Sequence, residues 1–176
     1  MANEKNARHE TRATVGCMRV VLMRHGEAVD TRLAPDDHRR WLTDGGRRSV
    51  RGVGTTLAGL DLQFSCIYTS PLVRAVQTAE ILAATQPAFD GPIEVHTPLS
   101  SDEGTTAQAL LPLEHAADDA VIAMVTHMPK VEVLAGHLAG TERFPPFQTA
   151  AACLIERVDG VGSFQWMLDP RTLALT

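Results

Sequence analysis

Short apolar runs that alternate with helical segments restrict the fold of this chain more than any other feature of its sequence. The runs predicted as strands are residues 19–23, 65–69, 93–95, 120–126, 150–157 and 163–168. The segments predicted as helices are residues 43–59, 70–84, 105–115 and 129–139. Strands that alternate with helices form a mostly parallel sheet with helices on both faces. We therefore predict an α/β protein with three layers, α/β/α.

The starts of these helices are marked by residues that prefer such positions. Thr43 is expected to cap the first helix, because its hydroxyl can accept a hydrogen bond from a free backbone N–H. Ser70 is expected to cap the second helix, with Pro71 in its first turn. Another helix is expected to begin at Pro129, with Thr126 as its cap.

Length and hydropathy predict a single domain and a cytoplasmic location. A chain of 176 residues suits a single domain, and we assign it to residues 18–176, after a flexible N-terminal tail over residues 1–17. The tail is polar and lacks the apolar stretch of a secretory signal. No run approaches the roughly 20 apolar residues that span a bilayer. We expect a cytoplasmic protein that does not bind membranes.

Charge and cysteine content exclude further classes of function. The formal net charge is −5, and an acidic protein is a poor nucleic-acid binder. The three cysteines, at positions 17, 66 and 153, are widely spaced and form no Cys-x-x-Cys pair. This pattern argues against a zinc knuckle or a redox dithiol, and it favours reduced thiols in a reducing compartment.

Cationic side chains follow three of the predicted parallel strands. Arg24 and His25 come after the first strand, Arg74 lies one turn into the helix after the second, and His127 follows the run at 120–126. In open α/β sheets the chemistry collects beyond the carboxyl ends of the strands. Two arginines and two histidines without a carboxylate cluster make a poor metal site, but they suit phosphoryl oxygens. We expect a phosphoryl pocket that needs no metal or other cofactor.

The nucleophile of such a pocket is predicted to be an imidazole. No cysteine precedes an arginine with the Cys-x5-Arg spacing of cysteine phosphatases, and neither a Gly-x-Ser-x-Gly elbow nor a Walker A loop occurs. Imidazole can itself attack phosphorus. His25 suits this role, because the neighbouring Gly26 would let a phosphate approach the backbone closely.

Three motifs in this order resemble those of the histidine phosphatase superfamily, whose fold is phosphoglycerate mutase-like. They are Met-Arg-His-Gly-Glu at 23–27, Ser-Pro-Leu-Val-Arg-Ala-Val-Gln-Thr at 70–78 and Val-Thr-His-Met at 125–128. The resemblance implies that His25 becomes phosphorylated and is then freed by water. It also implies that Arg24, Arg74 and His127 hold the phosphoryl oxygens.

The brevity of the chain points to one branch of that superfamily. Little room exists between Thr78 and His127 for a segment that roofs the pocket, so we expect a shallow, open site that admits a phosphate displayed on another protein. Arg-Trp-Leu-Thr at 40–43 and Pro-Pro-Phe-Gln-Thr at 145–149 resemble the SixA-type phosphohistidine phosphatases of bacteria. The resemblance implies a signalling role and a phosphorylated protein partner, such as a histidine-phosphotransfer domain.

Several supporting roles stay open on the sequence. The candidate substrate-binding residues are Gly26, Glu27, Arg40 and Ser70, although Glu27 fits a loop buttress or a solvated side chain equally well and Arg40 fits a plain surface role. Asp102 and Glu103 are candidates for a general acid, but neither matches the pattern of the superfamily well. The alternatives are a phosphomonoesterase acting on sugar or nucleotide phosphates and an inactive phosphohistidine-binding module.

Overall fold

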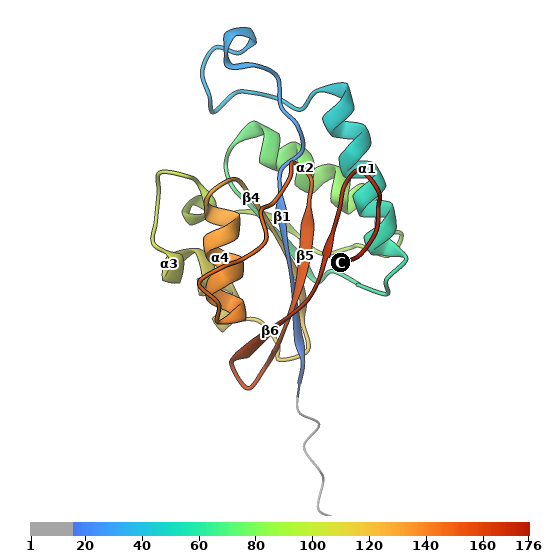
Figure 1. Ribbon diagram of the computed structural model, residues 1–176, viewed down its shortest axis with the longest axis vertical. Coiled ribbons are helices and arrows are strands. Elements are labelled where there is room, and N and C mark those ends of the chain that lie inside the picture. The colour runs from blue at the N-terminus through green and yellow to red at the C-terminus, as the bar shows by residue number, and fades with distance from the viewer. Residues whose placement is uncertain (1–15) are drawn as a thin grey trace, which may run out of the picture.

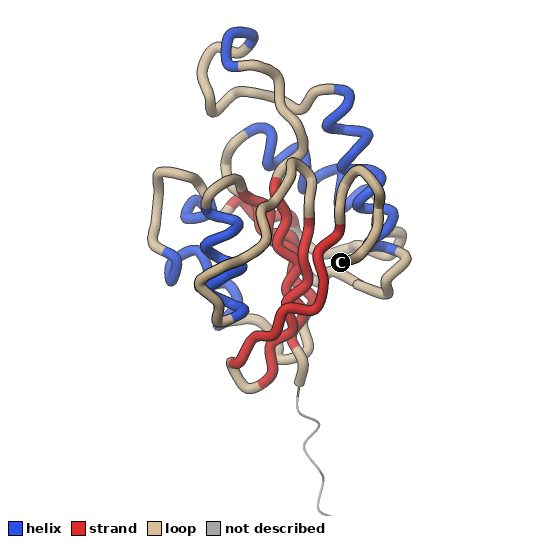
Figure 2. The backbone as a smooth tube through the Cα atoms, viewed as in Figure 1, coloured by secondary structure: helices blue, strands red, loops and turns tan. Residues whose placement is uncertain are grey.

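A six-stranded sheet runs through the middle of the computed structural model, which describes residues 16–176 (Figures 1 and 2). The strands are β1 (Met18–Arg24), β2 (Cys66–Thr69), β3 (Ile93–Val95), β4 (Val121–Thr126), β5 (Ala152–Val158) and β6 (Val161–Leu168). Their order is β3-β2-β4-β1-β5-β6; the first four are mutually parallel, whereas β5 and β6 are antiparallel to their neighbours. The predicted, mostly parallel sheet is confirmed. The prediction of a tail over residues 1–17 lies, for residues 1–15, outside the described residues.

Helices cover both faces of this sheet, as the alternating pattern predicted. The α-helices are α1 (Asp44–Ala58), α2 (Val73–Ala84), α3 (Thr106–Glu114) and α4 (Lys130–Ala139), and short 3-10 turns occupy Thr31–Leu33 and Thr97–Leu99. Helices α1 and α2 pack on one face in one hydrophobic cluster, whereas α3 and α4 pack on the other face in a second cluster (Figure 1). The three-layer α/β/α architecture is therefore confirmed.

Strand β1 illustrates why a central parallel strand reads as a continuous apolar run. Val21 and Met23 belong to the cluster under α1 and α2, while Val20 and Leu22 belong to the cluster under α3 and α4. Successive side chains of a strand point to opposite faces, so a strand covered on both sides has no position for a polar residue. The run ends at Arg24, at the C-terminal end of the strand, where the chain leaves the sheet.

The start of α1 agrees with its prediction, but the start of α2 does not. The Thr43 hydroxyl accepts a hydrogen bond from the Gly46 N–H at 2.9 Å, as expected for a helix cap. Helix α2 instead begins at Val73, with Leu72 in the capping position and no side-chain cap. Ser70 lies two residues before this position, and its hydroxyl only accepts a long contact from the Leu72 N–H at 3.4 Å.

Thr126 is also not a helix cap. Its hydroxyl donates a hydrogen bond of 2.6 Å to the carbonyl oxygen of Leu99. This bond connects the end of β4 to the segment that follows β3, and Thr126 is fully buried there. The loop is held a second time by the ammonium group of Lys130, which donates to the carbonyl oxygens of Pro98 and Glu103 at 2.7 and 2.6 Å.

The register of the parallel strands brings the predicted site residues to one edge. Arg24 of β1 lies opposite Thr126 of β4, and Thr69 of β2 lies opposite Val125. The chain segments that follow these residues therefore leave the sheet side by side at its upper edge in Figure 1. That edge carries the residues of all three motifs.

Helix α1 packs unusually closely against the turn that follows β1. A Cβ atom at Gly46 would collide with the backbone of Glu27, and one at Gly26 would come within 2.7 Å of a Val50 methyl group. Glycine is needed at both positions because no side chain fits between the helix and the turn. This close packing fixes the position of the turn after β1, which carries His25, relative to α1.

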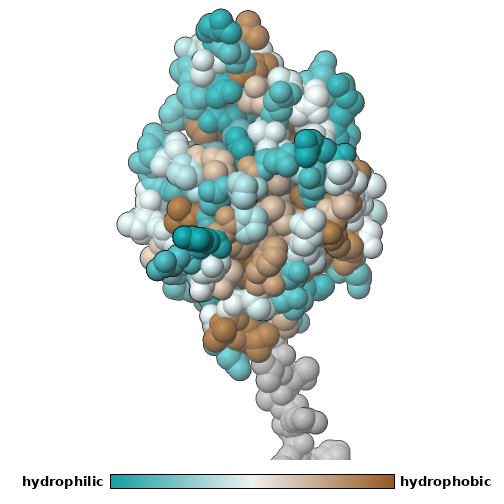
Figure 3. Space-filling view, viewed as in Figure 1, coloured by the Kyte–Doolittle hydropathy of each residue, from teal (hydrophilic) through white to brown (hydrophobic). Residues whose placement is uncertain are grey.

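The far end of the molecule has a different surface from the motif edge. The hairpin between β5 and β6 exposes Val158 and Val161, and Figure 3 shows hydrophobic surface gathered at that lower end. Within residues 16–176, no helix has both the length and the hydropathy required to cross a membrane. The cytoplasmic location stays a prediction.

We predict that Gly46→Ala destabilises the protein by about 1–3 kcal/mol, because the new methyl group forces the turn away from α1. Gly52→Ala is the matched control in the same helix, since a Cβ there would meet only the Leu173 side chain at an ordinary 3.6 Å. This control should gain about 0.5–1 kcal/mol from helix propensity. Chemical denaturation measures both changes, and equal stability of the two variants would contradict the packing argument.

Candidate active site

His25 lies at the base of the motif edge and is held at both ring nitrogens. Its backbone N–H donates to the carbonyl oxygen of Thr126 at 2.9 Å, and only 8% of its surface is exposed. Its Nδ1 lies 2.7 Å from the carbonyl oxygen of Gly26, while Arg74 Nε donates to its Nε2 at 3.1 Å. In the neutral ring the proton therefore sits on Nδ1, and Nε2 carries the lone pair.

The surroundings of His25 favour the neutral, nucleophilic ring. Burial is the largest cause that lowers its pKa, to about 4; the nearby Arg74 and Arg24 guanidiniums lower it further, and the Gly26 carbonyl partly opposes them. An imidazole with this pKa is uncharged at pH 7, so Nε2 is available to attack an electrophile.

Arg74 reaches His25 from the first turn of α2, and Thr78 holds that helix in place. The Thr78 hydroxyl donates to the carbonyl oxygen of Arg74 at 2.7 Å and accepts from the Gly26 N–H at 3.1 Å. One side chain therefore links α2 to the turn that carries His25. Arg74 itself is only 6% exposed, so its guanidinium is a fixed charge rather than a mobile surface group.

Arg24 and His127 complete the base of the site, and each presents a buried nitrogen atom without a partner among the described residues. Arg24 Nη1 donates to the carbonyl oxygen of Phe147 at 2.8 Å, but among the described residues no group accepts from its buried Nε. The buried Nε2 of His127 is likewise without a partner in this part of the chain. Burial, followed by the charge of Arg74, lowers the pKa of His127 to about 4. Buried polar atoms without partners are costly, and an anionic ligand would satisfy both.

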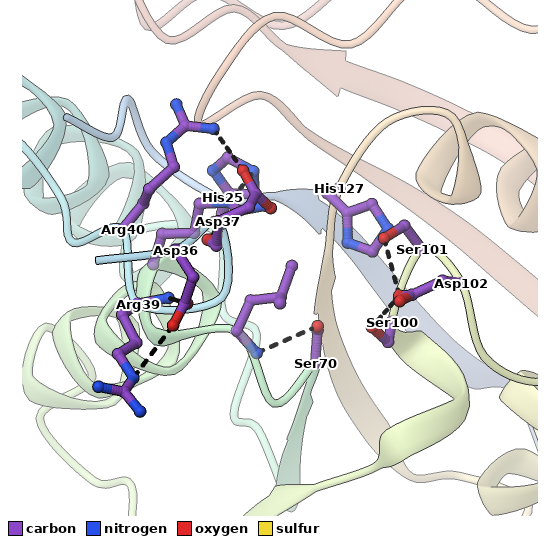
Figure 4. Close-up of polar contacts among 12 residues, drawn as sticks. His25, Asp36, Asp37, Arg39, Arg40, Ser70, Ser100, Ser101, Asp102 and His127 are labelled. Atoms are coloured by element: carbon purple, nitrogen blue, oxygen red, sulfur yellow. Dashed lines mark hydrogen bonds and ion pairs between the residues drawn. The ribbon is translucent and has the colours of Figure 1, made fainter. Parts of the chain in front are cut away.

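These side chains line one cleft of about 390 Å³. Among the predicted residues, it brings together His25, Arg24, Arg74, His127, Glu27 and Arg40. Figure 4 shows His25 with Asp37 and Arg40 on one side, and His127 with Ser101 and Asp102 on the other. The base of the cleft is buried, while its rim, which includes Glu27 and Asp37, is more exposed.

Two predicted substrate-binding residues do not face this cleft. The Ser70 side chain is fully buried beneath the start of α2 and does not line the cleft (Figure 4). The Gly26 N–H is occupied by Thr78, and a glycine is required at this position by packing against α1 rather than by approach of a phosphate. The structure therefore does not place Ser70 and Gly26 on the wall of the cleft, because local packing uses both residues.

Glu27 makes the contact expected of a loop buttress, and it also lines the cleft as a substrate-binding residue would. Its Oε2 accepts a hydrogen bond of 2.8 Å from the hydroxyl of Thr43, the residue that caps α1. Arg40 is held at the cleft rather than being a free surface group, since its Nε donates to the carbonyl oxygen of Val29 at 2.7 Å.

The two candidates for a general acid are poorly placed for that role. Neither Asp102 nor Glu103 lines the cleft. Hydrogen bonds from the Ser100 and Ser101 hydroxyls lower the pKa of Asp102, so this carboxyl group stays ionised and accepts rather than donates. The backbone of Glu103 is tied to Lys130 instead.

Asp37 and Thr78 take part in the site although sequence reasoning assigned neither a role. Asp37 accepts from Arg74 through both its backbone carbonyl and its carboxylate, at 2.6 and 2.9 Å. It lies in a loop without periodicity, where no pattern distinguishes it from the neighbouring Asp36. Thr78 belongs to the second motif, and its place four residues after Arg74, one helical turn, was a usable signal for a hydrogen bond to the backbone.

The arrangement is suited to a phosphoryl group. Helices α2 and α4 both begin at this edge, so the positive ends of their dipoles add to the arginine charges. Within residues 16–176, no group of three or more His, Cys, Asp or Glu side chains is placed to hold a metal ion. The chain's own cations can bind the equatorial oxygens of a phosphoryl group while His25 Nε2 faces phosphorus.

We predict that His25 titrates with a pKa of about 4 in the free protein. Because this pKa lies below the ordinary value of about 6.5, the ring is still neutral when the pH falls through 6.5. It gains its proton only as the pH falls to about 4. The ¹H–¹⁵N resonances of the ring, assigned with the His25→Ala variant, report the titration. A midpoint near 6.5 would contradict the environment described for this ring.

Comparisons with known proteins agree with this geometry. Residues 20–100 match the model of the Histidine phosphatase superfamily (branch 1). An uncharacterized protein of Picosynechococcus is 39% identical over 114 residues, which are 64% of this chain and 67% of that protein. Phosphohistidine phosphatase SixA of Escherichia coli is 29% identical over 90% of this chain and 98% of its own length.

Solved structures of histidine phosphatases and of a phosphoglycerate mutase have a similar fold. The protein histidine phosphatase SixA, complexed with tungstate, superposes with a TM-score of 0.80 at 29% identity, over 89% of this chain and all of that chain. Phosphoglycerate mutase from Bacillus anthracis shares the fold, with a TM-score of 0.64 at 16% identity over 86% of this chain and 92% of its own. With its three motifs gathered around one cleft, the chain belongs to the histidine phosphatase superfamily and has the phosphoglycerate mutase-like fold.

Proposed function

We propose that this protein is a metal-independent phosphohistidine phosphatase that acts on a phosphorylated protein, such as a histidine-phosphotransfer domain. One observation carries the proposal: a neutral His25 ring lies in a buried cationic base whose Arg24 Nε and His127 Nε2 lack partners among the described residues. The name of the related SixA proteins, phosphohistidine phosphatase, supports the same substrate class.

The first step transfers the phosphoryl group to His25. As the phosphoryl oxygens take up hydrogen bonds from Arg24, Arg74 and His127, Arg74 Nε releases His25 Nε2. The freed lone pair attacks phosphorus and forms a new P–N bond, while the bond to the leaving nitrogen breaks and its electron pair stays on that nitrogen. The fixed guanidiniums stabilise the charge on the equatorial oxygens during transfer.

The second step returns the enzyme to its resting state. Water attacks phosphorus on the side opposite His25, the P–N bond breaks, and its electron pair returns to Nε2 as a lone pair. The oxygen of the water stays on the product phosphate, and its displaced proton passes to solvent. The hydrogen bond between Nδ1 and the Gly26 carbonyl keeps the ring in the orientation that both steps need.

The composition of the cleft favours a P–N substrate over a phosphate ester. A phosphohistidine that is protonated on its free ring nitrogen releases a neutral imidazole, so it needs no acid from the enzyme. An ester releases an alkoxide, which is far more basic than imidazole with its pKa of about 6.5 and requires a proton donor. Asp102 and Glu103 lie outside the cleft, so neither is placed to donate that proton. Of the two carboxyl groups that line the cleft, Asp37 has its pKa lowered by hydrogen bonds from Arg40 and Arg74, and Glu27 accepts a hydrogen bond from Thr43.

The open rim suits a phosphate that is displayed on another protein. His25, Arg74 and His127 lie at the buried base, whereas the side chain of Asp37 at the rim is 52% exposed. A phosphorylated side chain on a partner's surface can therefore enter the cleft through its exposed rim without a large rearrangement.

We predict that the wild-type protein removes phosphate from a phosphorylated histidine-phosphotransfer domain in the presence of EDTA, and that His25→Ala slows this by about a thousandfold or more, because the nucleophile is lost. His137→Ala is the matched control, since His137 is exposed on α4 and does not line the cleft. Loss of radioactive label from the partner measures the rate. Acid-labile phosphate trapped on wild type, and absent from His25→Ala, identifies the intermediate.

The same assay separates the alternatives. Faster hydrolysis of sugar or nucleotide phosphates than of the phosphoprotein would replace the proposal with a small-molecule phosphomonoesterase. Binding of the phosphoprotein without hydrolysis or trapped label would replace it with an inactive phosphohistidine-binding module. Loss of activity in EDTA would refute the metal-independent mechanism.

A further inference from the structure

Asp37 accepts hydrogen bonds from two of the arginines that line the cleft. It lies in the loop between β1 and α1, beside His25 in Figure 4, and lines the same cleft. Its carboxylate accepts from two guanidiniums, with Oδ2 2.9 Å from Arg74 Nη2 and Oδ1 2.9 Å from Arg40 Nη1. Two oxygens held by two guanidiniums is also the pattern in which arginines bind phosphoryl oxygens.

A guanidinium can bind phosphate with two hydrogen bonds from its Nη1–Nη2 edge or from its Nε–Nη2 edge, and all three nitrogen atoms of Arg74 already donate hydrogen bonds. The edge formed by Nη1 and Nη2 donates to the backbone carbonyl and the carboxylate of Asp37, and Nε donates to His25. A guanidinium offers phosphate its two-pronged geometry only from such an edge. A phosphoryl group must therefore displace the Asp37 carboxylate from Nη2, in addition to the release of His25 by Nε in the proposed reaction, before the Nε–Nη2 edge of Arg74 can bind it with two hydrogen bonds.

The two partners of this edge differ in how readily they can move. His25 is 8% exposed and is fixed through its backbone, whereas the Asp37 side chain is 52% exposed. A carboxylate at that exposure can rotate into water at little cost, because water replaces its hydrogen bonds. Arg74 is buried and cannot follow it, so the guanidinium requires another anion once Asp37 has left.

We propose that Asp37 is an affinity-determining residue: its carboxylate is the resident ligand of Arg74 and Arg40, and the phosphoryl group of the substrate displaces it. This inference rests on the proposed function to the extent that the cleft binds phosphoryl groups. Displacement frees Arg74 Nη2 and Arg40 Nη1 for the substrate, while Arg74 Nη1 keeps its hydrogen bond to the backbone carbonyl of Asp37. The carboxylate therefore weakens the hold of the site on any phosphate, including the product.

The test compares the binding of inorganic phosphate by calorimetry to wild type, Asp37→Asn and Asp36→Asn. Asp37→Asn should bind phosphate about fivefold more tightly, since a competitor of roughly 1 kcal/mol is removed. Asp36→Asn is the matched control: it removes the same charge from the same loop, but Asp36 pairs with Arg39 at the surface and does not line the cleft. Its affinity should stay within twofold of wild type.

Equal or weaker phosphate binding by Asp37→Asn would overturn the inference, and so would an equal gain in Asp36→Asn. A second measurement uses only the wild-type protein and does not depend on the folding of a variant. Saturating phosphate should shift the carboxyl ¹³C resonance of Asp37 and leave that of Asp36 in place, and an unmoved Asp37 resonance would also overturn the inference.

The outcome is independent of turnover. Tighter phosphate binding by Asp37→Asn in a protein whose His25 never carries phosphate would refute the proposed function and support the role of Asp37. Labelled His25 together with unchanged phosphate affinity in Asp37→Asn would leave the proposed function standing and refute the role of Asp37.

Discussion

The hydrogen bond from the backbone of His25 to the carbonyl oxygen of Thr126 is the contact on which the site depends. It extends the pairing of β1 with β4 by one step beyond Arg24 and Thr126, so the two motif histidines leave the sheet from neighbouring positions. A shift of one residue in this register would turn one of the imidazoles to the other face of the sheet. Side-chain alternation along β1 between two hydrophobic clusters opposes such a shift, and the core thereby sets the geometry of the chemistry.

Electrostatics at the base of the cleft is unfavourable without a ligand. Burial lowers the pKa values of Arg24, His25 and His127, because each would have to carry its charge away from water. Such a site is stable only when the surrounding structure holds it in place, and here the close packing of α1 and the Thr78 bridge to α2 do so. The free energy that folding spends on this arrangement becomes available when an anion binds.

The sequence predicted the parts of this protein that obey periodic or positional rules. The apolar runs, the Thr43 cap and the gathering of the motif residues at one edge follow from the alternation of side chains, from helix capping and from strand direction. The helix predicted over 70–84 begins at Val73 in the structure, because Ser70 and Pro71, which resemble a capping signal, lie in the turn before it. Sequence alone does not reveal that Thr78 occupies the Gly26 N–H, since this contact depends on how closely α1 and α2 approach the turn.

Asp37 shows the limit of such reasoning most clearly. Asp36 and Asp37 are identical in type and adjacent in an irregular loop, yet one pairs with Arg39 in solvent and the other with the buried Arg74. Nothing local distinguishes them, because the choice is made by the position of a guanidinium that comes from a helix 37 residues further along the chain. The base of the cleft comes from strand ends and helix starts, which the sheet positions, whereas the rim comes from loops. The fold therefore positions the histidines and arginines at the base, while a loop whose conformation only the whole structure determines positions the Asp37 carboxylate at the rim.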